Sequence, residues 1–226
     1  MERSWRRRAG RACPAALVSL GVCSAVALAA NLAGTSGPDL LKGTAGADRI
    51  FGFQGNDAII AGAGDDTVEG GSNSDIIDGE AGDDTLRGDG RDRKCLPGAT
   101  SDRYCTLVLA TGAGDSIDGG AGDDVISGQD GPDSVSGGPG SDTVSGGAAS
   151  DGVSGGSGLD IVSGGAGDDL ITGGSGPDRI DGGSGDDRIS ARDGTRDRID
   201  CGTGTDTVIA DRVDFVAQSC ERIIGR

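Results

Sequence analysis

The stretch that decides the fold is GGAGDDLIT (164–172), followed directly by GGSGPDRID (173–181) and GGSGDDRIS (182–190). The three segments share the pattern Gly-Gly-x-Gly-x-Asp-x-U-x, in which U is a large aliphatic residue. A fixed short period of this kind indicates a repeat architecture, in which each unit buries its apolar face against its neighbours.

The aspartate and the aliphatic residue keep their phase over sixteen repeats, which form two arrays at residues 43–88 and 110–209. The aspartates are Asp48, Asp57, Asp66, Asp75, Asp84, Asp115, Asp124, Asp133, Asp142, Asp151, Asp160, Asp169, Asp178, Asp187, Asp197 and Asp206. The aliphatic residues are Ile50, Ile59, Val68, Ile77, Leu86, Ile117, Ile126, Val135, Val144, Val153, Val162, Ile171, Ile180, Ile189, Ile199 and Val208.

The segment x-U-x is a minimal strand, in which U points to one face and its two neighbours point to the other. Because the neighbours are mostly Ser, Thr, Asp or Arg, we expect U to face a thin interior and the neighbours to face water. Two repeats then make one coil of 18 residues. The predicted fold is all-β: a parallel β-roll, a type of β-helix or solenoid.

The other six residues, Gly-Gly-x-Gly-x-Asp, form the turn. Glycine permits positive φ and close approach of backbone to backbone. The turn therefore directs carbonyl oxygens and one carboxylate at a common point, and stacked coils lie about 4.8 Å apart. A set of hard oxygen ligands in a flexible cage suits Ca²⁺. We predict that the sixteen aspartates ligate multiple Ca²⁺ ions, and that folding depends on these ions.

On these residues the chain resembles the hemolysin-type calcium-binding repeat family, also called RTX, over roughly residues 43–209. The resemblance implies a parallel β-roll with calcium ions held in the turns between stacked coils. If each ion joins two stacked turns, about twelve sites are the ceiling. The best sites are expected between Gly119 and Ser190, where the repeats are cleanest.

Several repeats depart from the pattern. The third glycine of a repeat is replaced by Asn73 and by Ala149, and the second by Glu80 and by Gln129. Ala113 also stands where glycine is expected, and one inserted residue shifts the stretch 191–200. Fewer ions than the ceiling are therefore expected.

The composition limits the partners and the chemistry. The chain has 46 Gly and no His among its 226 residues, with 37 acidic and 20 basic residues. Removing residues 1–30 takes away five arginines and one glutamate, which leaves a charge of about −21. Cations are the natural partners of such a chain, whereas nucleic acid and anionic membranes are repelled. The lack of histidine excludes the usual serine-histidine and metalloprotease mechanisms, and we predict no catalytic site.

Residues 1–30 have the features of a secretory signal: an arginine-rich start, an apolar run over 15–30 and an Ala-x-Ala site at residues 27–29. We expect a secreted, extracellular protein with no membrane insertion after cleavage. A retained anchor and a lipidated leader are the alternatives. Residues 31–42 are assigned to a linker and N-terminal cap.

Two segments lie outside the repeats. Residues 89–109 read as an insertion loop closed by a Cys95–Cys105 disulfide, and residues 210–226 as a C-terminal cap tied by Cys201–Cys220. An even cysteine number in an exported chain favours these disulfides, with free thiols as the alternative. The loop is either a tolerated insertion or a site for an unknown extracellular partner.

Function is predicted from the turns: a secreted calcium-binding protein. The alternative is a surface or adhesive structural protein that calcium makes rigid. An enzyme and an acidic disordered linker are disfavoured, since the paired aspartates recur at turn positions and the phase is kept over many repeats.

Overall fold

The computed structural model describes residues 29–89, 91–95, 105–109 and 112–225, and the side chains of 90–111 are outside this description. The predicted leader, residues 1–30, lies almost entirely outside the described residues. No helix of the described part has the length and the apolar character of a membrane span.

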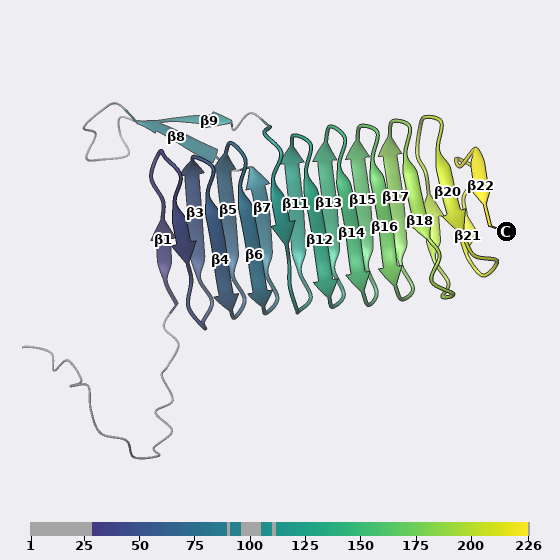
Figure 1. Ribbon diagram of the computed structural model, residues 1–226, viewed down its shortest axis with the longest axis horizontal. Coiled ribbons are helices and arrows are strands. Elements are labelled where there is room, and N and C mark those ends of the chain that lie inside the picture. Colours follow the sequence, from purple (N-terminus) through teal and green to yellow (C-terminus); the bar gives the residue numbers. More distant parts are fainter. Residues whose placement is uncertain (1–28, 90, 96–104, 110–111, 226) are drawn as a thin grey trace, which may run out of the picture.

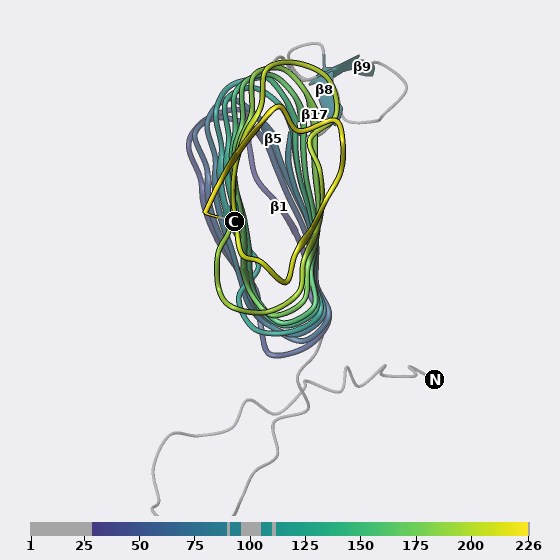
Figure 2. The ribbon, with the colours of Figure 1, turned by 90° about the vertical axis from the view of Figure 1, so that its right-hand side faces the viewer.

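The chain forms a solenoid of two parallel ten-stranded sheets that face each other across a thin interior (Figures 1 and 2). The first sheet contains β1 (Asn31–Ala33), β3 (Arg49–Gln54), β5 (Thr67–Ser72), β7 (Thr85–Asp89), β11 (Val125–Asp130), β13 (Thr143–Ala148), β15 (Ile161–Ala166), β17 (Arg179–Ser184), β19 (Arg198–Asp200) and β21 (Phe215–Val216). The second contains β2 (Leu40–Lys42), β4 (Ala58–Ala63), β6 (Ile76–Ala81), β10 (Ser116–Asp118), β12 (Ser134–Pro139), β14 (Gly152–Ser157), β16 (Leu170–Ser175), β18 (Arg188–Ala191), β20 (Thr207–Ala210) and β22 (Arg222–Ile224).

Successive strands alternate between the sheets, so each strand pairs with the strand one coil away. Val144 lies opposite Val162, and Val153 lies opposite Ile171, which is the 18-residue coil expected from the repeat. The predicted parallel β-roll is confirmed.

The interior is a single file of aliphatic side chains from each sheet. All sixteen predicted U residues are 3% exposed or less. Their outward neighbours are exposed or half-buried, as in β16 and β17. The alternation of apolar and polar residues across x-U-x therefore sets which face of each strand is buried.

The turns need the left-handed backbone region at two positions of the repeat. Gly165 and Gly167, the second and fourth residues of their repeat, have φ of 113° and 136°. The replacements Asn73, Glu80, Gln129 and Ala149 keep positive φ, as does Phe53, which also replaces the second glycine of its repeat. A side chain at such a position costs strain that glycine does not.

The segment 31–42, assigned from the sequence to a linker and cap, contains β1 and β2, which pair with β3 and β4. The C-terminal segment likewise continues the stack, because β21 pairs with β19 and β22 pairs with β20. The predicted Cys201–Cys220 disulfide is present. The tail is therefore a last coil joined to the repeats by that bond.

The insertion is an antiparallel hairpin of β8 (Arg91–Cys95) and β9 (Cys105–Leu109). It lies along the edge of the solenoid that is uppermost in Figure 1, where β8 contacts β3 and β5. Its register places the backbone of Cys95 opposite that of Cys105. The side chains lie outside the described part, so the second disulfide stays a prediction.

Replacing Ala149 by Gly should stabilise the protein by roughly 1 kcal/mol, because φ of 92° is strained for alanine and not for glycine. The measurement is thermal or denaturant unfolding at saturating calcium. Ala148→Gly is the matched control: the adjacent alanine lies in β13 without positive φ, so its replacement should destabilise. Equal effects of both substitutions would contradict this account of the turn.

Candidate functional site

The sixteen predicted site aspartates lie in two rows, one along each edge of the flattened solenoid. The row that precedes the first sheet contains Asp48, Asp66, Asp84, Asp124, Asp142, Asp160, Asp178 and Asp197, and the row that precedes the second contains Asp57, Asp75, Asp115, Asp133, Asp151, Asp169, Asp187 and Asp206. Every one of these residues is 4% exposed or less. The structure thus brings each half of the predicted set together along one edge, and it separates the two halves.

Within a row, the carboxylates and the backbone form a continuous ladder. The N–H of Asp142 donates to Oδ1 of Asp160, and the N–H of Asp160 donates to Oδ1 of Asp178, at 2.9 and 3.0 Å. The same bond joins the aspartates of the other row, such as Asp151 to Asp169 at 2.9 Å. One carboxylate oxygen of each rung is therefore used inside the protein.

The ladders extend beyond the predicted set. Asp39 donates its N–H to Asp57, Asp197 donates to Oδ1 of Asp214, and Asp206 donates to Oε2 of Glu221. Asp39, Asp214 and Glu221 were not among the ladder residues predicted from the repeat. Asp39 keeps the 18-residue spacing to Asp57 and could have been found by that signal, whereas Asp214 and Glu221 follow at spacings of 17 and 15.

The second carboxylate oxygen, Oδ2, is buried without a hydrogen-bond donor at most rungs. This holds for Asp57, Asp66, Asp84, Asp115, Asp124, Asp133, Asp142, Asp151, Asp160, Asp169, Asp178, Asp187 and Asp206. A buried carboxylate oxygen without a donor or a cation loses solvation that nothing replaces. These atoms are the strongest indication that the turns take a positive charge.

Backbone oxygens converge on the same places. A Cβ built on Gly155, the first residue of its repeat, would lie 2.4 Å from the carbonyl oxygen of Gly173 and 2.7 Å from Oδ2 of Asp160. On Gly119 it would lie 2.5 Å from both Asp124 Oδ2 and the Gly137 carbonyl oxygen. We call this space a cradle: the place beside the first glycine of a repeat where its own aspartate and the next coil each contribute an oxygen.

The cradles fit a hard cation with oxygen ligands, since they offer carboxylate and carbonyl oxygens and no donors. In the described residues no three His, Cys, Asp or Glu side chains group as metal ligands. An ion would therefore need carbonyl oxygens as well as carboxylates. Calcium accepts such mixed sets of six to eight oxygens.

Burial, together with the charges of neighbouring aspartates, raises the pKa of most aspartates in the two rows. Burial, with the charges of Asp75, Asp133 and Asp89, raises the pKa of Asp115 to about 8. Burial and neighbouring aspartates raise the pKa of Asp84 and Asp178 to about 7. Asp48 differs: burial acts to raise its pKa, but hydrogen bonds from Ala30 and Thr44 hold the value below the usual one.

Comparison with protein families matches the chain to the RTX calcium-binding nonapeptide repeat over residues 33–68, 60–92, 109–144, 127–162, 163–196 and 172–208. The matched segments cover both arrays and overlap the aspartate rows. No curated protein matches the chain.

The raised pKa values predict that acid stabilises the calcium-free protein. The folded state holds protons that the unfolded state releases above about pH 4, so this stabilisation is complete below that pH and is lost as pH rises through about 6 to 8. In excess chelator, the strand signal in far-UV circular dichroism should therefore increase from pH 8 to pH 5. A signal that stays constant or falls over this range would contradict the prediction.

Proposed function

Because the chain belongs to the RTX calcium-binding nonapeptide repeat family, we propose that it is an exported calcium-binding protein whose β-roll folds when ions fill the turns. One observation carries the proposal: buried Oδ2 atoms without donors converge with carbonyl oxygens of the next coil. Calcium, when bound, would supply positive charge to these carboxylates.

The ligands proposed at each turn are the sixth-position aspartate and the backbone carbonyl of the first residue in the next coil. At the cradle of Gly155 these are Asp160 and Gly173. The ladder bond to Oδ1 fixes the orientation of the carboxylate, so its other oxygen is directed into the cradle before an ion arrives. The ladder bond and the turn backbone thus hold Oδ2 of Asp160 and the carbonyl oxygen of Gly173 on the same side of Gly155.

Coupling of folding to calcium follows from the shape of the interior. Each repeat buries only one large aliphatic side chain, whereas nine residues, several of them glycine, lose conformational entropy when they are ordered. The carboxylate rows add repulsion at the spacing of the strands. Ion binding is the favourable contribution that offsets these costs.

Export is proposed from the arginine-rich start and the apolar run that precede the roll. Such a leader directs a chain to compartments that permit disulfides, which agrees with the Cys201–Cys220 bond. It also directs the chain to compartments richer in calcium than the cytosol.

A second candidate is a structural or adhesive surface protein in which calcium serves rigidity alone. It is favoured by the elongated stack of two ten-stranded sheets (Figure 1). Both candidates are non-catalytic. The chain has no histidine, and in each adjacent pair of aspartates the sixth-position carboxylate is held in a ladder.

Calcium should convert the full chain from a largely disordered state into a strand-rich one. The measurement is far-UV circular dichroism with calorimetric titration of calcium after chelation. Equal strand content in chelator and in millimolar calcium, at neutral pH, would overturn the proposal.

Replacing Asp160 by Asn should raise the calcium concentration at half-folding by about tenfold. The asparagine keeps an acceptor for the Asp142 N–H but loses a charge-assisted interaction of roughly 1.5–3 kcal/mol. Asp181→Asn is the matched control, since Asp181 is exposed on the sheet face and should leave the midpoint unchanged. Equal shifts in both variants would indicate that only net charge matters.

Export has its own test. When the full chain is expressed in a host with a secretory pathway, the protein should accumulate outside the cytoplasm with an N-terminus after Ala29, as read by mass spectrometry. Retention in the cytoplasm with residues 1–30 intact would reject export and leave calcium binding untouched.

A further inference from the structure

The cradles differ at the first position of the repeat. Glycine occupies it in most repeats, and from Gly119 to Gly182 without exception. Among the described repeats four have a residue with a Cβ: Ala61, Ala191, Cys201 and Ala210. All four are buried, at 1% exposed or less.

The register shows that these Cβ atoms lie where the cradles lie. Ile60 pairs with Asp78 and Gly62 pairs with Glu80, so Ala61 stands opposite Gly79. Ala191 pairs with Ala210 in the same way. A Cβ at this position meets the carboxylate of its own repeat and the carbonyl oxygen of the next coil, as the neighbouring glycines show. Because a Cβ cannot approach both oxygens this closely, the carboxylate and the carbonyl oxygen of such a turn cannot converge as they do beside a glycine.

The first two turns are closed in a different way. The N–H and Oγ1 of Thr44 both donate to Oδ2 of Asp48, at 2.5 and 3.0 Å. Thr35 donates to Oδ2 of Asp39 in the same manner, at 2.5 and 2.9 Å. Threonine stands at the second position of both repeats. Its N–H and hydroxyl give Oδ2 of the aspartate two hydrogen bonds, whereas Oδ2 accepts none in most interior turns.

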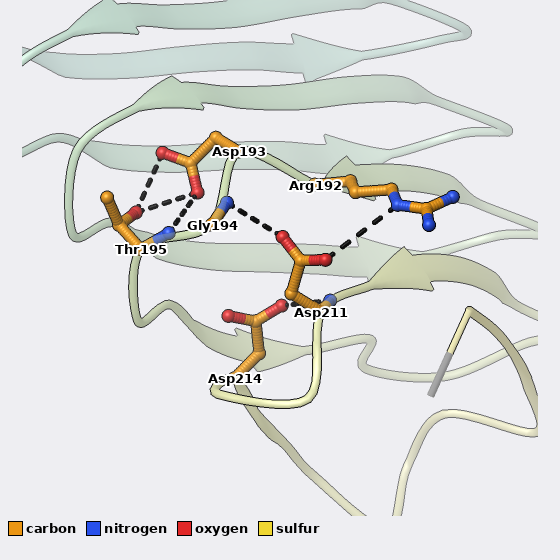
Figure 3. A network of polar contacts seen from close by, with 6 residues as sticks. All are labelled: Arg192, Asp193, Gly194, Thr195, Asp211 and Asp214. Atoms are coloured by element: carbon orange, nitrogen blue, oxygen red, sulfur yellow. Dashed lines mark hydrogen bonds and ion pairs between the residues drawn. The ribbon is translucent and has the colours of Figure 1, made fainter.

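At the C-terminal end both features occur: residues with a Cβ at the first position, and a hydrogen-bond donor to Oδ2 at the second position. The N–H of Asp211 donates to Oδ2 of Asp214 at 2.5 Å, again from the second position of the repeat (Figure 3). Asp211 also accepts a hydrogen bond from the Gly194 N–H and lies 3.7 Å from Arg192 Nε (Figure 3). Cys201, joined to Cys220, brings a disulfide to the first position of the repeat of Asp206.

We propose that the two ends of the solenoid are closed to calcium by the chain's own atoms: Thr35, Thr44 and Ala61 at the N-terminal end, and Ala191, Cys201 and Ala210 at the C-terminal end. The ions then lie between Gly52 and Asp187, except in the turn of Asp66, which Ala61 closes. Asp48, Asp66, Asp197 and Asp206, four of the predicted ligands, do not complete a site in their own turns. The inference rests on the proposed calcium function and specifies where that function stops.

Ala61 offers the sharpest test. Asp66 Oδ2 has no donor, so its turn is closed by one carbon atom alone and a single substitution reopens it. The full chain carrying Ala61→Gly should bind one more calcium ion than the wild type. The ratio is measured by atomic emission of calcium per chain after gel filtration at saturating calcium. Ala63→Gly, the same substitution at the third position of the same repeat, should leave the ratio unchanged.

Unchanged calcium content in Ala61→Gly, or an equal gain in Ala63→Gly, would overturn the inference. The reverse variant, Gly155→Ala, should lose one ion, because its Cβ would enter the cradle of Asp160. If Gly155→Ala fails to fold, Ala61→Gly still decides the matter. A wild type that binds no calcium would instead reject the proposed function, so the two failures are distinguishable.

Discussion

The structure depends on one interaction: a buried carboxylate that accepts, through one oxygen, the backbone N–H of the aspartate one coil earlier. Repetition of this bond fixes the height of each turn relative to the next, so the strands that follow meet in register. It also stacks negative charges at the spacing of β-strands in a buried row. The fold is thereby tied to something that neutralises the row, whether protons or metal ions.

The two carboxylate oxygens of each aspartate make different interactions, which explains why the sixth position of the repeat is aspartate. Oδ1 makes the ladder bond and Oδ2 faces the cradle. Asparagine could accept the ladder hydrogen bond, but it would lack the negative charge that attracts a cation. The first glycine of the repeat serves the same arrangement: without a Cβ, Gly155 leaves room for Asp160 to fold back over its turn. Glycine is thus favoured at the first position of the repeat because a Cβ would clash there, and at the second position because the backbone has positive φ.

Much of the fold was predictable because the nine-residue period determines which residues are buried and where the turns fall. The phase of Val162 and Ile171 sets the strand faces, and the phase of Asp160 and Asp169 sets the two rows. The repeat of Asp39 was assigned to a linker and cap because Thr35 breaks its glycine pair and no aspartate stands nine residues earlier, at Ala30. The functional meaning of Ala61 and Cys201 was missed for another reason: a small residue in place of glycine is conservative by hydrophobicity and is decisive only when the cradle geometry is known.

The insertion shows what the ladder tolerates. Asp75 donates to Asp115 and Asp84 donates to Asp124 across 40 residues instead of 18, at 2.8 and 2.7 Å. The extra 22 residues enter within a turn, between Asp89 and Gly112, where the chain leaves and rejoins the stack. Lengthening a loop adds little closure entropy once the ends are fixed. An insertion within x-U-x would instead reverse the faces of a strand and expose its aliphatic residue. Because the ladder requires only that the next aspartate return to its place in the row, the turns are where this fold can accept new sequence.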